Sequence, residues 1–212
     1  MPLSREVTLA DGIRVAIWQI TESAGEIRAK IDLDQLEEEV LLTYTHEQRK
    51  RQWLASRAAV KHLVHPAPAN LTYDQHGKPH LVKGTGFISI SHSGDYAAAV
   101  SGMNSAVGID IEQIRDRIER VQQRFLSVAE LDCLGNTHRL EELYVHWGAK
   151  EALYKLYGKP EVDFKKDIYI HPFDYLCNMP GNCTATLTAP GFTAEYRLVY
   201  EKIGAYMLVV AY

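Results

Sequence analysis

The stretch WGAKEALYK, at residues 147–155, matches an earlier stretch, WLASRAAVK at residues 53–61, and this match is the basis of the predicted fold. The Trp, both shared Ala positions and the Lys coincide at an offset of 94 positions (53 to 147). Two further motifs recur in the same order, GKP at 77–79 and 158–160, and a Gly-x-Tyr strand pattern at 94–100 and 204–210. Three repeated features in one order favour an internal duplication.

Helical and strand patterns alternate in both copies. We predict helices over Thr45–Val64 and Leu140–Tyr157, the first with a capping box between Thr45 and Gln48. Apolar runs on either side of Ser93-Gly94-Asp95 predict a hairpin. The expected fold is α+β, with two similar halves, 1–104 and 105–212, related by pseudo-two-fold symmetry. A cleft between such halves is the natural binding site.

Composition narrows the class of protein. Apolar residues make up 46% and charged residues 24%, and the net charge of -4 argues against a nucleic-acid partner. No apolar run approaches the roughly 20 residues that span a membrane, and MPLSREVTLADG has no secretory-signal pattern. Three cysteines without CxxC spacing favour a reducing compartment. We therefore expect a cytoplasmic protein without a membrane partner.

Two acids occupy a probable strand in the segment VGIDIE, residues 107–112. Residues i and i+2 of a strand share a face, so Asp110 and Glu112 project together. Adjacent carboxylates repel each other, and a hard divalent cation such as Mg²⁺ removes that repulsion. Two solvated carboxylates at a strand end, paired with Arg115 or Arg117, would explain the same pattern.

The helix at 147–155 carries a second candidate group. Trp147, Glu151 and Lys155 are spaced i, i+4, i+8 and share one helix face. Glu151 could complete a three-carboxylate metal site, and Lys155 could reach a phosphate of the same ligand. An ordinary surface Glu–Lys pair is the alternative.

A polar cluster and a basic helix face supply the remaining candidates. His92 lies between Ser91 and Ser93, and these side chains could donate hydrogen bonds to phosphate. A histidine satisfied by a turn hydroxyl is the alternative, and a Ser-His-Asp hydrolase is disfavoured because no G-x-S-x-G elbow is present. Arg57 occupies the repeat position of Glu151, so we expect the two to face the cleft from opposite halves.

Four ordered motifs together resemble the 4′-phosphopantetheinyl transferase superfamily, in its surfactin-synthetase-activating, pseudo-dimeric single-chain form. They are GKPHL at 77–81, ISISHSG at 88–94, VGIDIE at 107–112 and WGAKEALYK at 147–155. The resemblance implies a holo-[acyl-carrier-protein] synthase that acts as a monomer. Such an enzyme transfers the 4′-phosphopantetheine arm of coenzyme A to a serine of an apo acyl or peptidyl carrier protein and releases 3′,5′-adenosine bisphosphate.

The resemblance also implies roles for individual residues. It implies that Mg²⁺, or alternatively Mn²⁺, is bound by Asp110, Glu112 and Glu151. It also implies that the pyrophosphate of coenzyme A contacts Ser91 and Lys155, that the 3′-phosphate contacts His92 and Arg57, and that the adenosine-phosphate end contacts Lys78. Glu151, acting either directly or through a metal-bound water, is our hypothesis for the general base, with Lys155 beside it as the second catalytic side chain.

Two other functions use the same residues. A Mg²⁺-dependent phosphodiester hydrolase would use the three carboxylates with a positioned water and no carrier protein. A non-catalytic module that binds coenzyme A or another nucleotide would not need the whole set of acids and Lys155.

Overall fold

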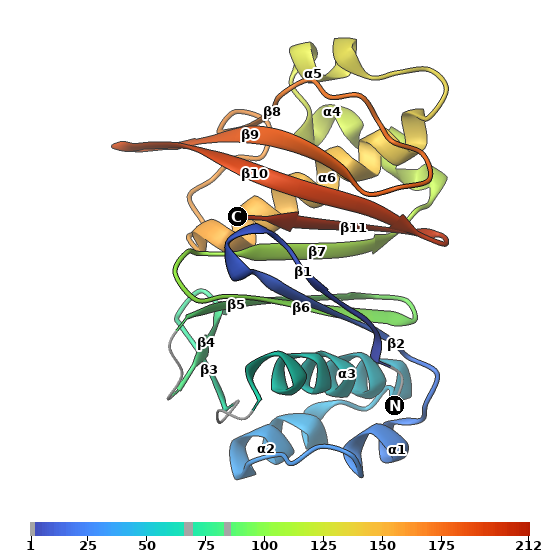
Figure 1. Ribbon diagram of the computed structural model, residues 1–212, viewed down its shortest axis with the longest axis vertical. Helices are drawn as coiled ribbons and strands as arrows, with labels where there is room; N and C mark the ends of the chain where they lie inside the picture. Colours follow the sequence, from blue (N-terminus) through green and yellow to red (C-terminus); the bar gives the residue numbers. More distant parts are fainter. Residues whose placement is uncertain (1–2, 66–69, 83–85) are drawn as a thin grey trace. The chain divides into compact units, whose positions relative to one another are not determined.

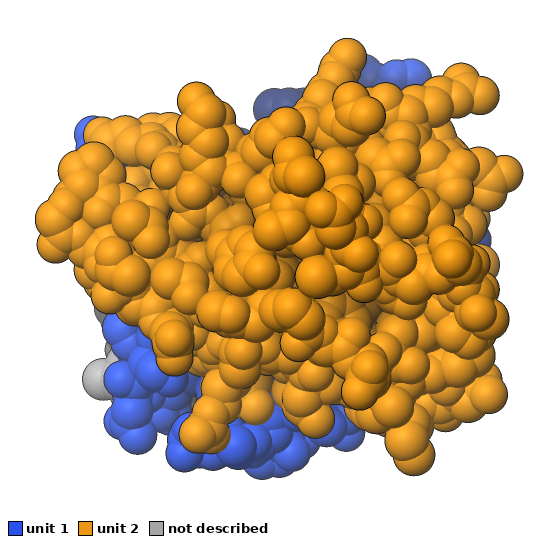
Figure 2. Space-filling model, turned by 90° about the horizontal axis from the view of Figure 1, so that it is seen from above, with its two compact units in different colours: residues 1–106 blue, residues 107–212 orange. Residues whose placement is uncertain are grey.

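The computed structural model describes residues 3–65, 70–82 and 86–212 (Figure 1). The chain divides into two compact units, Met1–Ala106 and Val107–Tyr212, which Figure 2 colours separately. Each unit combines one antiparallel sheet with one long helix. The α+β class with two similar halves is therefore confirmed.

The first unit is built on a four-stranded antiparallel sheet with helix α3 (Glu47–Val64) packed against it. In sheet order the strands are β1 (Leu3–Thr8), β2 (Arg14–Gln19), β6 (Tyr96–Gly102) and β5 (Phe87–Ser93). The helix packs against β2, β5 and β6 through buried residues that include Leu54, Ala55 and Ala59. The smaller elements are η1 (Ala10–Gly12), α1 (Ala24–Arg28), α2 (Gln35–Thr43) and the ribbon of β3 (Leu71–Tyr73) and β4 (Pro79–Leu81).

Side-chain caps fix where two short helices of this unit begin. Ser23 and Asp34 each cap a helix, α1 and α2, and each forms a capping box with a glutamate three residues later. The long helix has no such cap, because it begins at Glu47 after His46, whose side chain makes no capping hydrogen bond. The predicted Thr45–Gln48 capping box is therefore wrong.

The second unit is built on a five-stranded antiparallel sheet with helix α6 (Arg139–Tyr157) packed against it. In sheet order the strands are β7 (Gly108–Gln113), β11 (Tyr206–Ala211), β10 (Phe192–Ile203), β9 (Gly181–Ala189) and β8 (Ile168–Ile170). Three short helical segments join β7 to α6, namely η2 (Asp116–Arg120), α4 (Gln122–Phe125) and α5 (Val128–Cys133). The helix packs chiefly against β7 and β11, which positions its side chains over the start of the sheet.

The two units share their central topology and register. In the first, β2 pairs with β6 so that Gln19 lies opposite Tyr96, and in the second, β7 pairs with β11 so that Gln113 lies opposite Tyr206. The residue after each strand donates a backbone hydrogen bond of 2.8 Å to the hairpin turn, from Ile20 to Asp95 and from Ile114 to Ala205. The offset of 94 that relates the long helices therefore also relates β2 to β7.

The turn in which each Gly-x-Tyr motif lies explains why its first residue is glycine. Gly94 and Gly204 begin the two-residue turns of the β5–β6 and β10–β11 hairpins, with φ of 53° and 58°. A positive φ is costly for residues with a side chain and free for glycine. Within the described ranges, no helix is both long enough and apolar enough to cross a membrane.

Candidate functional site

The first acid of VGIDIE, Asp110, is buried on β7 and paired with a lysine. Asp110 is 4% exposed, and its Oδ1 accepts a hydrogen bond of 2.7 Å from Lys155 Nζ. Lys155 also donates to the backbone oxygen of Ile109 at 3.1 Å. The neighbours Ile109 and Ile111 are fully buried, as the alternation predicts. The ammonium of α6 therefore lies directly against the first acid of β7.

Two glycines allow helix α6 to lie directly on the sheet at this point. A Cβ on Gly108 would fall 1.9 Å from the backbone oxygen of Ala152, which lies in the middle of α6. A Cβ on Gly148 would fall 2.8 Å from a methyl of Val209 and 3.7 Å from Asp110 Oδ2. Contacts this close leave no room for a side chain, so both positions require glycine. They let the turn of α6 that contains Glu151 lie close to strand β7.

The charges of both strand acids act on Glu151. The pKa of Glu151 is raised from its usual 4.5 to about 7, chiefly by burial and next by the negative charge of Asp110. Lys155 opposes the rise in this pKa, and Glu112 adds a smaller increase. Glu151 is therefore close enough to Asp110, Glu112 and Lys155 to interact with them electrostatically.

The donor set of this cluster suits a divalent cation. Three carboxylates that repel one another in a partly buried site are what a hard cation with oxygen ligands neutralises. Within residues 3–65, 70–82 and 86–212, no three His, Cys, Asp or Glu side chains already stand in a metal-binding arrangement. Asp110 is held by Lys155 instead. The metal assignment stays a prediction.

A pocket of about 380 Å³ borders the same cluster. It is lined by Glu112, Arg117, Ile118, Arg120, Val121, Tyr144 and Trp147. Two of its walls are held firmly: the Tyr144 hydroxyl bonds both the N and the O of Arg115, and Trp147 packs edge-on against Phe125 at 5.1 Å. One acid of the strand thus faces a space with arginines and aromatic rings around it.

The predicted phosphate contacts of the first unit lie on different elements. Ser91 and His92 belong to β5, where Ser91 is buried and His92 Nε2 lies 2.9 Å from a terminal nitrogen of Arg49. Lys78 lies in the β3–β4 turn, where burial lowers its pKa and the charge of Asp74 partly opposes the change. The structure thus pairs His92 with a cation that the sequence analysis did not single out.

Arg57 is buried inside the first unit. It is 3% exposed, its Nε lies 3.3 Å from Glu37 Oε1, and its guanidinium hydrogen-bonds the Tyr73 hydroxyl. Its Cζ lies 4.4 Å from the centre of the Trp53 ring. Lys61, one turn along α3, also bonds Glu37, at 3.1 Å. The positive charge of Arg57 is therefore largely neutralised by Glu37 within the first unit.

Comparison with known proteins relates the second unit to one family. Residues 106–199 match the family model described as the 4′-phosphopantetheinyl transferase superfamily. This part of the chain is therefore similar to that superfamily. The matched region contains the whole cluster of Asp110, Glu112, Glu151 and Lys155, whereas the phosphate candidates of the first unit lie outside it.

Individual members of the superfamily match about half of the chain. The protein is 34% identical to the 4′-phosphopantetheinyl transferase AcpT of Escherichia coli O157:H7 over 119 residues, 52% of this chain and 59% of that protein. It is 32% identical to AcpT of Salmonella typhi over 116 residues, 52% of this chain and 60% of that protein. It is 32% identical to psf-1 of Bacillus pumilus over 120 residues, 51% of each. The match thus spans little more than half the length of these superfamily members.

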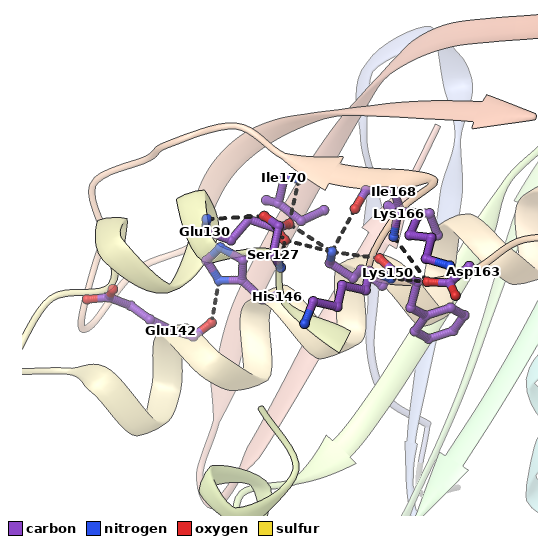
Figure 3. A network of polar contacts seen from close by, with 11 residues as sticks. Ser127, Glu130, Glu142, His146, Lys150, Asp163, Lys166, Ile168 and Ile170 are labelled. Carbon is purple, nitrogen blue, oxygen red and sulfur yellow. Dashed lines mark hydrogen bonds and ion pairs between the residues drawn. The ribbon is translucent and has the colours of Figure 1, made fainter. Parts of the chain in front are cut away.

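Sequence reasoning missed several residues that build the site. Gly108 and Gly148 lie inside the two motifs already singled out, but their role depends on the distance between helix and strand. Glu130 of α5 and Lys150 of α6 form a buried ion pair next to the turn that contains Glu151, shown with its neighbours in Figure 3. The pattern Ser127-x-x-Glu130 could have indicated a capping box, and the structure contains one.

Proposed function

We propose that this protein transfers the 4′-phosphopantetheine arm of coenzyme A to a serine of an apo carrier protein, with Mg²⁺ as the metal. The observation that carries the proposal is the pairing of Lys155 with Asp110 at 2.7 Å, together with the effect of both strand acids on the pKa of Glu151. Coenzyme A is a polyanion, so its pyrophosphate needs both a metal and cationic side chains. The match of residues 106–199 to the superfamily supports the same activity.

Glu151 has two tasks in this proposal, and each other residue of the cluster has one. Asp110, Glu112 and Glu151 would hold the metal, and Lys155 would contact the pyrophosphate. Bound Mg²⁺ would neutralise the pyrophosphate and the phosphate that leaves. Glu151 would also be the base: burial and Asp110 raise its pKa to about 7 in the protein without metal, and a bound cation would favour the ionised form that accepts a proton.

The transfer itself exchanges one phosphorus–oxygen bond for another. The carrier serine Oγ bonds to the phosphorus that bears pantetheine, and the bridging bond of the pyrophosphate breaks. The serine proton passes to Glu151, and 3′,5′-adenosine bisphosphate leaves with the bonding electron pair. Fixing both reactants in this geometry supplies much of the rate enhancement.

The pocket beside Glu112 receives the pantetheine arm in this proposal. Its walls combine Trp147 and Ile118 with Arg117 and Arg120, which suits an arm that alternates amides with short apolar segments. The pocket and the acids share Glu112, so an arm in the pocket would have its phosphate next to the cluster.

The first unit contributes contacts to the other end of coenzyme A. We assign the pyrophosphate to Ser91, the 3′-phosphate to His92 and Arg57, and the adenosine-phosphate end to Lys78. The pairing of His92 with Arg49 supports this for His92, since a guanidinium beside the imidazole adds positive charge where a phosphate would bind. Arg57 has the weaker support of the two because Glu37 already partners it.

Incubation with coenzyme A, Mg²⁺ and a set of apo carrier proteins tests the proposal. Mass spectrometry of the carrier should show the added mass of one phosphopantetheine on its serine, and the supernatant should contain 3′,5′-adenosine bisphosphate. Chelation of the metal should stop the reaction. Fatty-acid, polyketide and peptide-synthetase carriers each belong in the set.

Two other results would replace the proposal with a different function. Free phosphopantetheine without modified carrier would identify a phosphodiester hydrolase that uses the same carboxylates. Binding of coenzyme A without metal and without turnover would identify a non-catalytic binding module.

A further inference from the structure

A buried ion pair links helix α6 to two other segments of the second unit (Figure 3). Lys150 Nζ lies 2.8 Å from Glu130 Oε1, and both side chains are 0% exposed. Lys150 also donates to the backbone oxygens of Phe164 at 2.8 Å and Ile168 at 2.6 Å. The three protons of the ammonium therefore have three partners on two segments.

Glu130 is equally well satisfied. One of its oxygens accepts from the backbone N of Ile170 at 3.0 Å. The other accepts from the N and Oγ of Ser127 at 2.8 and 2.9 Å, in the capping box that starts α5. The pair thus ties α5, residues 164–170 and α6 together through hydrogen bonds that lie in the interior.

This network lies next to the candidate catalytic turn. Lys150 and Glu151 are successive residues of α6, so their side chains leave the helix about 100° apart. Lys150 holds the backbone of Phe164, whose ring packs against Trp147 at 5.7 Å and Tyr154 at 5.6 Å. Trp147, one turn before Glu151, also lines the pocket beside Glu112. A shift at Lys150 would therefore reach both Glu151 and a wall of the pocket.

We propose that the Lys150–Glu130 pair is a positioning device that sets the rotation of α6, and with it Glu151 and the Trp147 wall, relative to the acids of β7. The inference rests on the proposed function for its kinetic consequences. The geometry behind it is independent of that function, because it consists of contacts that the second unit makes within itself.

The first unit supports a role other than folding. Its long helix has Ser56 at the position of Lys150, and the Ser56 hydroxyl bonds Gln52 on its own helix at 2.8 Å. The repeated helix-on-sheet frame therefore forms without a pair at this helix position, although Arg57, the next residue of α3, pairs with Glu37. A buried ion pair is weak evidence for added stability, because desolvation offsets the attraction between the charges. Fixing one arrangement of three segments explains the pair better than stability does.

Two variants test the proposal against a plain loss of stability. Glu130→Gln keeps the size and an acceptor oxygen but removes the charge, and Lys150→Met removes the ammonium. Leu187→Ala in β9, a fully buried residue of the same sheet, is the matched destabilised control. Each purified protein is assayed for transfer to an apo carrier, with the rates corrected for the folded fraction from urea unfolding.

The two explanations predict different kinetics. A positioning role predicts a kcat about 10- to 100-fold lower in Glu130→Gln and in folded Lys150→Met, with KM for coenzyme A within about threefold of wild type. Leu187→Ala should then keep the wild-type kcat. Wild-type kcat in Glu130→Gln would overturn the proposal, even if Lys150→Met fails to fold.

A second measurement separates this proposal from the proposed function. Near-ultraviolet circular dichroism reports how Trp147 packs against Phe125 and Phe164, and it needs no substrate. Glu130→Gln should change that spectrum while Leu187→Ala leaves it unchanged. If wild-type protein modifies no carrier, the proposed function fails, but an altered spectrum still supports the positioning role and an unaltered one overturns it.

Discussion

The two units use one frame for opposite arrangements of charge. At the offset of 94, Asp110 and Glu112 of β7 correspond to Ala16 and Trp18 of β2. On the helices, Glu151 corresponds to Arg57, whereas Lys155 corresponds to another lysine, Lys61. The second unit therefore has two carboxylates on β7 and a third on α6, with Lys155 paired to Asp110, and the first has neither strand acid.

The first unit neutralises its buried charge within itself. Glu37, which is 5% exposed, pairs with both Arg57 and Lys61 from α3. In the second unit burial and Asp110 leave Glu151 with a pKa raised to about 7. A charge cluster that already has its partners is structural, and one with excess negative charge can take a cation. The comparison teaches that the same helix position can serve either purpose.

The largest expected effect is on turnover, from the substitution Glu151→Gln. The amide keeps the shape but cannot take the serine proton, so kcat for transfer should fall by about 10²- to 10⁴-fold. Coenzyme A binding with Mg²⁺, measured by calorimetry, should weaken less because Asp110 and Glu112 remain. Glu195→Gln, on the exposed edge of β10, is the matched control and should leave kcat unchanged. Near-normal turnover in Glu151→Gln would remove both roles of this residue.

The equivalent substitution in the first unit should act on stability instead. Arg57→Met leaves Glu37 buried with Lys61 alone, and removal of one partner from a buried pair costs about 3 to 5 kcal/mol. Arg28→Met, which breaks the exposed pair of Arg28 with Glu38, should cost about 1 kcal/mol or less. Urea unfolding measures both.

The assay with dephospho-coenzyme A shows whether Arg57 also serves the ligand. If it contacts the 3′-phosphate, KM for coenzyme A rises in Arg57→Met while KM for dephospho-coenzyme A does not. Equal KM changes for the two donors would make Arg57 a structural residue of the first unit alone.

Close packing of helix on strand is the next difference to test. Gly108→Ala would push a methyl into the backbone oxygen of Ala152 in α6, which should cost about 3 kcal/mol and lower turnover by moving Glu151. The first unit has Arg14 at this position and Leu54 at that of Gly148. Arg14→Ala loses a partly exposed ion pair with Glu6 and a hydrogen bond to the backbone oxygen of Leu63, and it should cost about 1 to 2 kcal/mol. Equal losses in the two variants, measured by urea unfolding, would contradict this difference.

Much of the fold could be predicted from the repeated motifs. The nonapeptide repeat and the two Gly-x-Tyr motifs predicted the paired helices and hairpins, because helix periodicity and turn glycines act locally. The edge strand β8 and its neighbour β9 were not predicted, although residues 181–189 alternate between buried and exposed side chains. The Thr45 cap failed because the helix starts two residues later, where Thr45 cannot reach its backbone.

The site was predicted less completely than the fold. Spacing alone predicted that Asp110 and Glu112 share a face of β7 and that Glu151 and Lys155 share a face of α6, because strand and helix periods are fixed. It could not reveal that Glu37 partners Arg57, since that pair depends on how α2 packs against α3. The Lys150–Glu130 pair was hidden for the same reason: 20 residues separate its members.

The smallest expected effect is a pH dependence of stability that comes from Glu151. The first unit should not show it, because it has Arg57 at the equivalent position. Because the pKa of Glu151 is about 7 in the folded state, against its ordinary value of 4.5, the folded state holds this proton more tightly. Its contribution, at most about 3 kcal/mol, is fully present below pH 4.5 and is lost as the pH rises through about 7. Urea unfolding at pH 5 and pH 8 should therefore show a larger loss for wild type than for Glu151→Gln. Mg²⁺ at pH 8 should restore stability to wild type more than to the variant, since binding to the folded state stabilises it. Identical pH dependence in the two proteins would mean that neither burial nor Asp110 raises the pKa of Glu151 in the folded state.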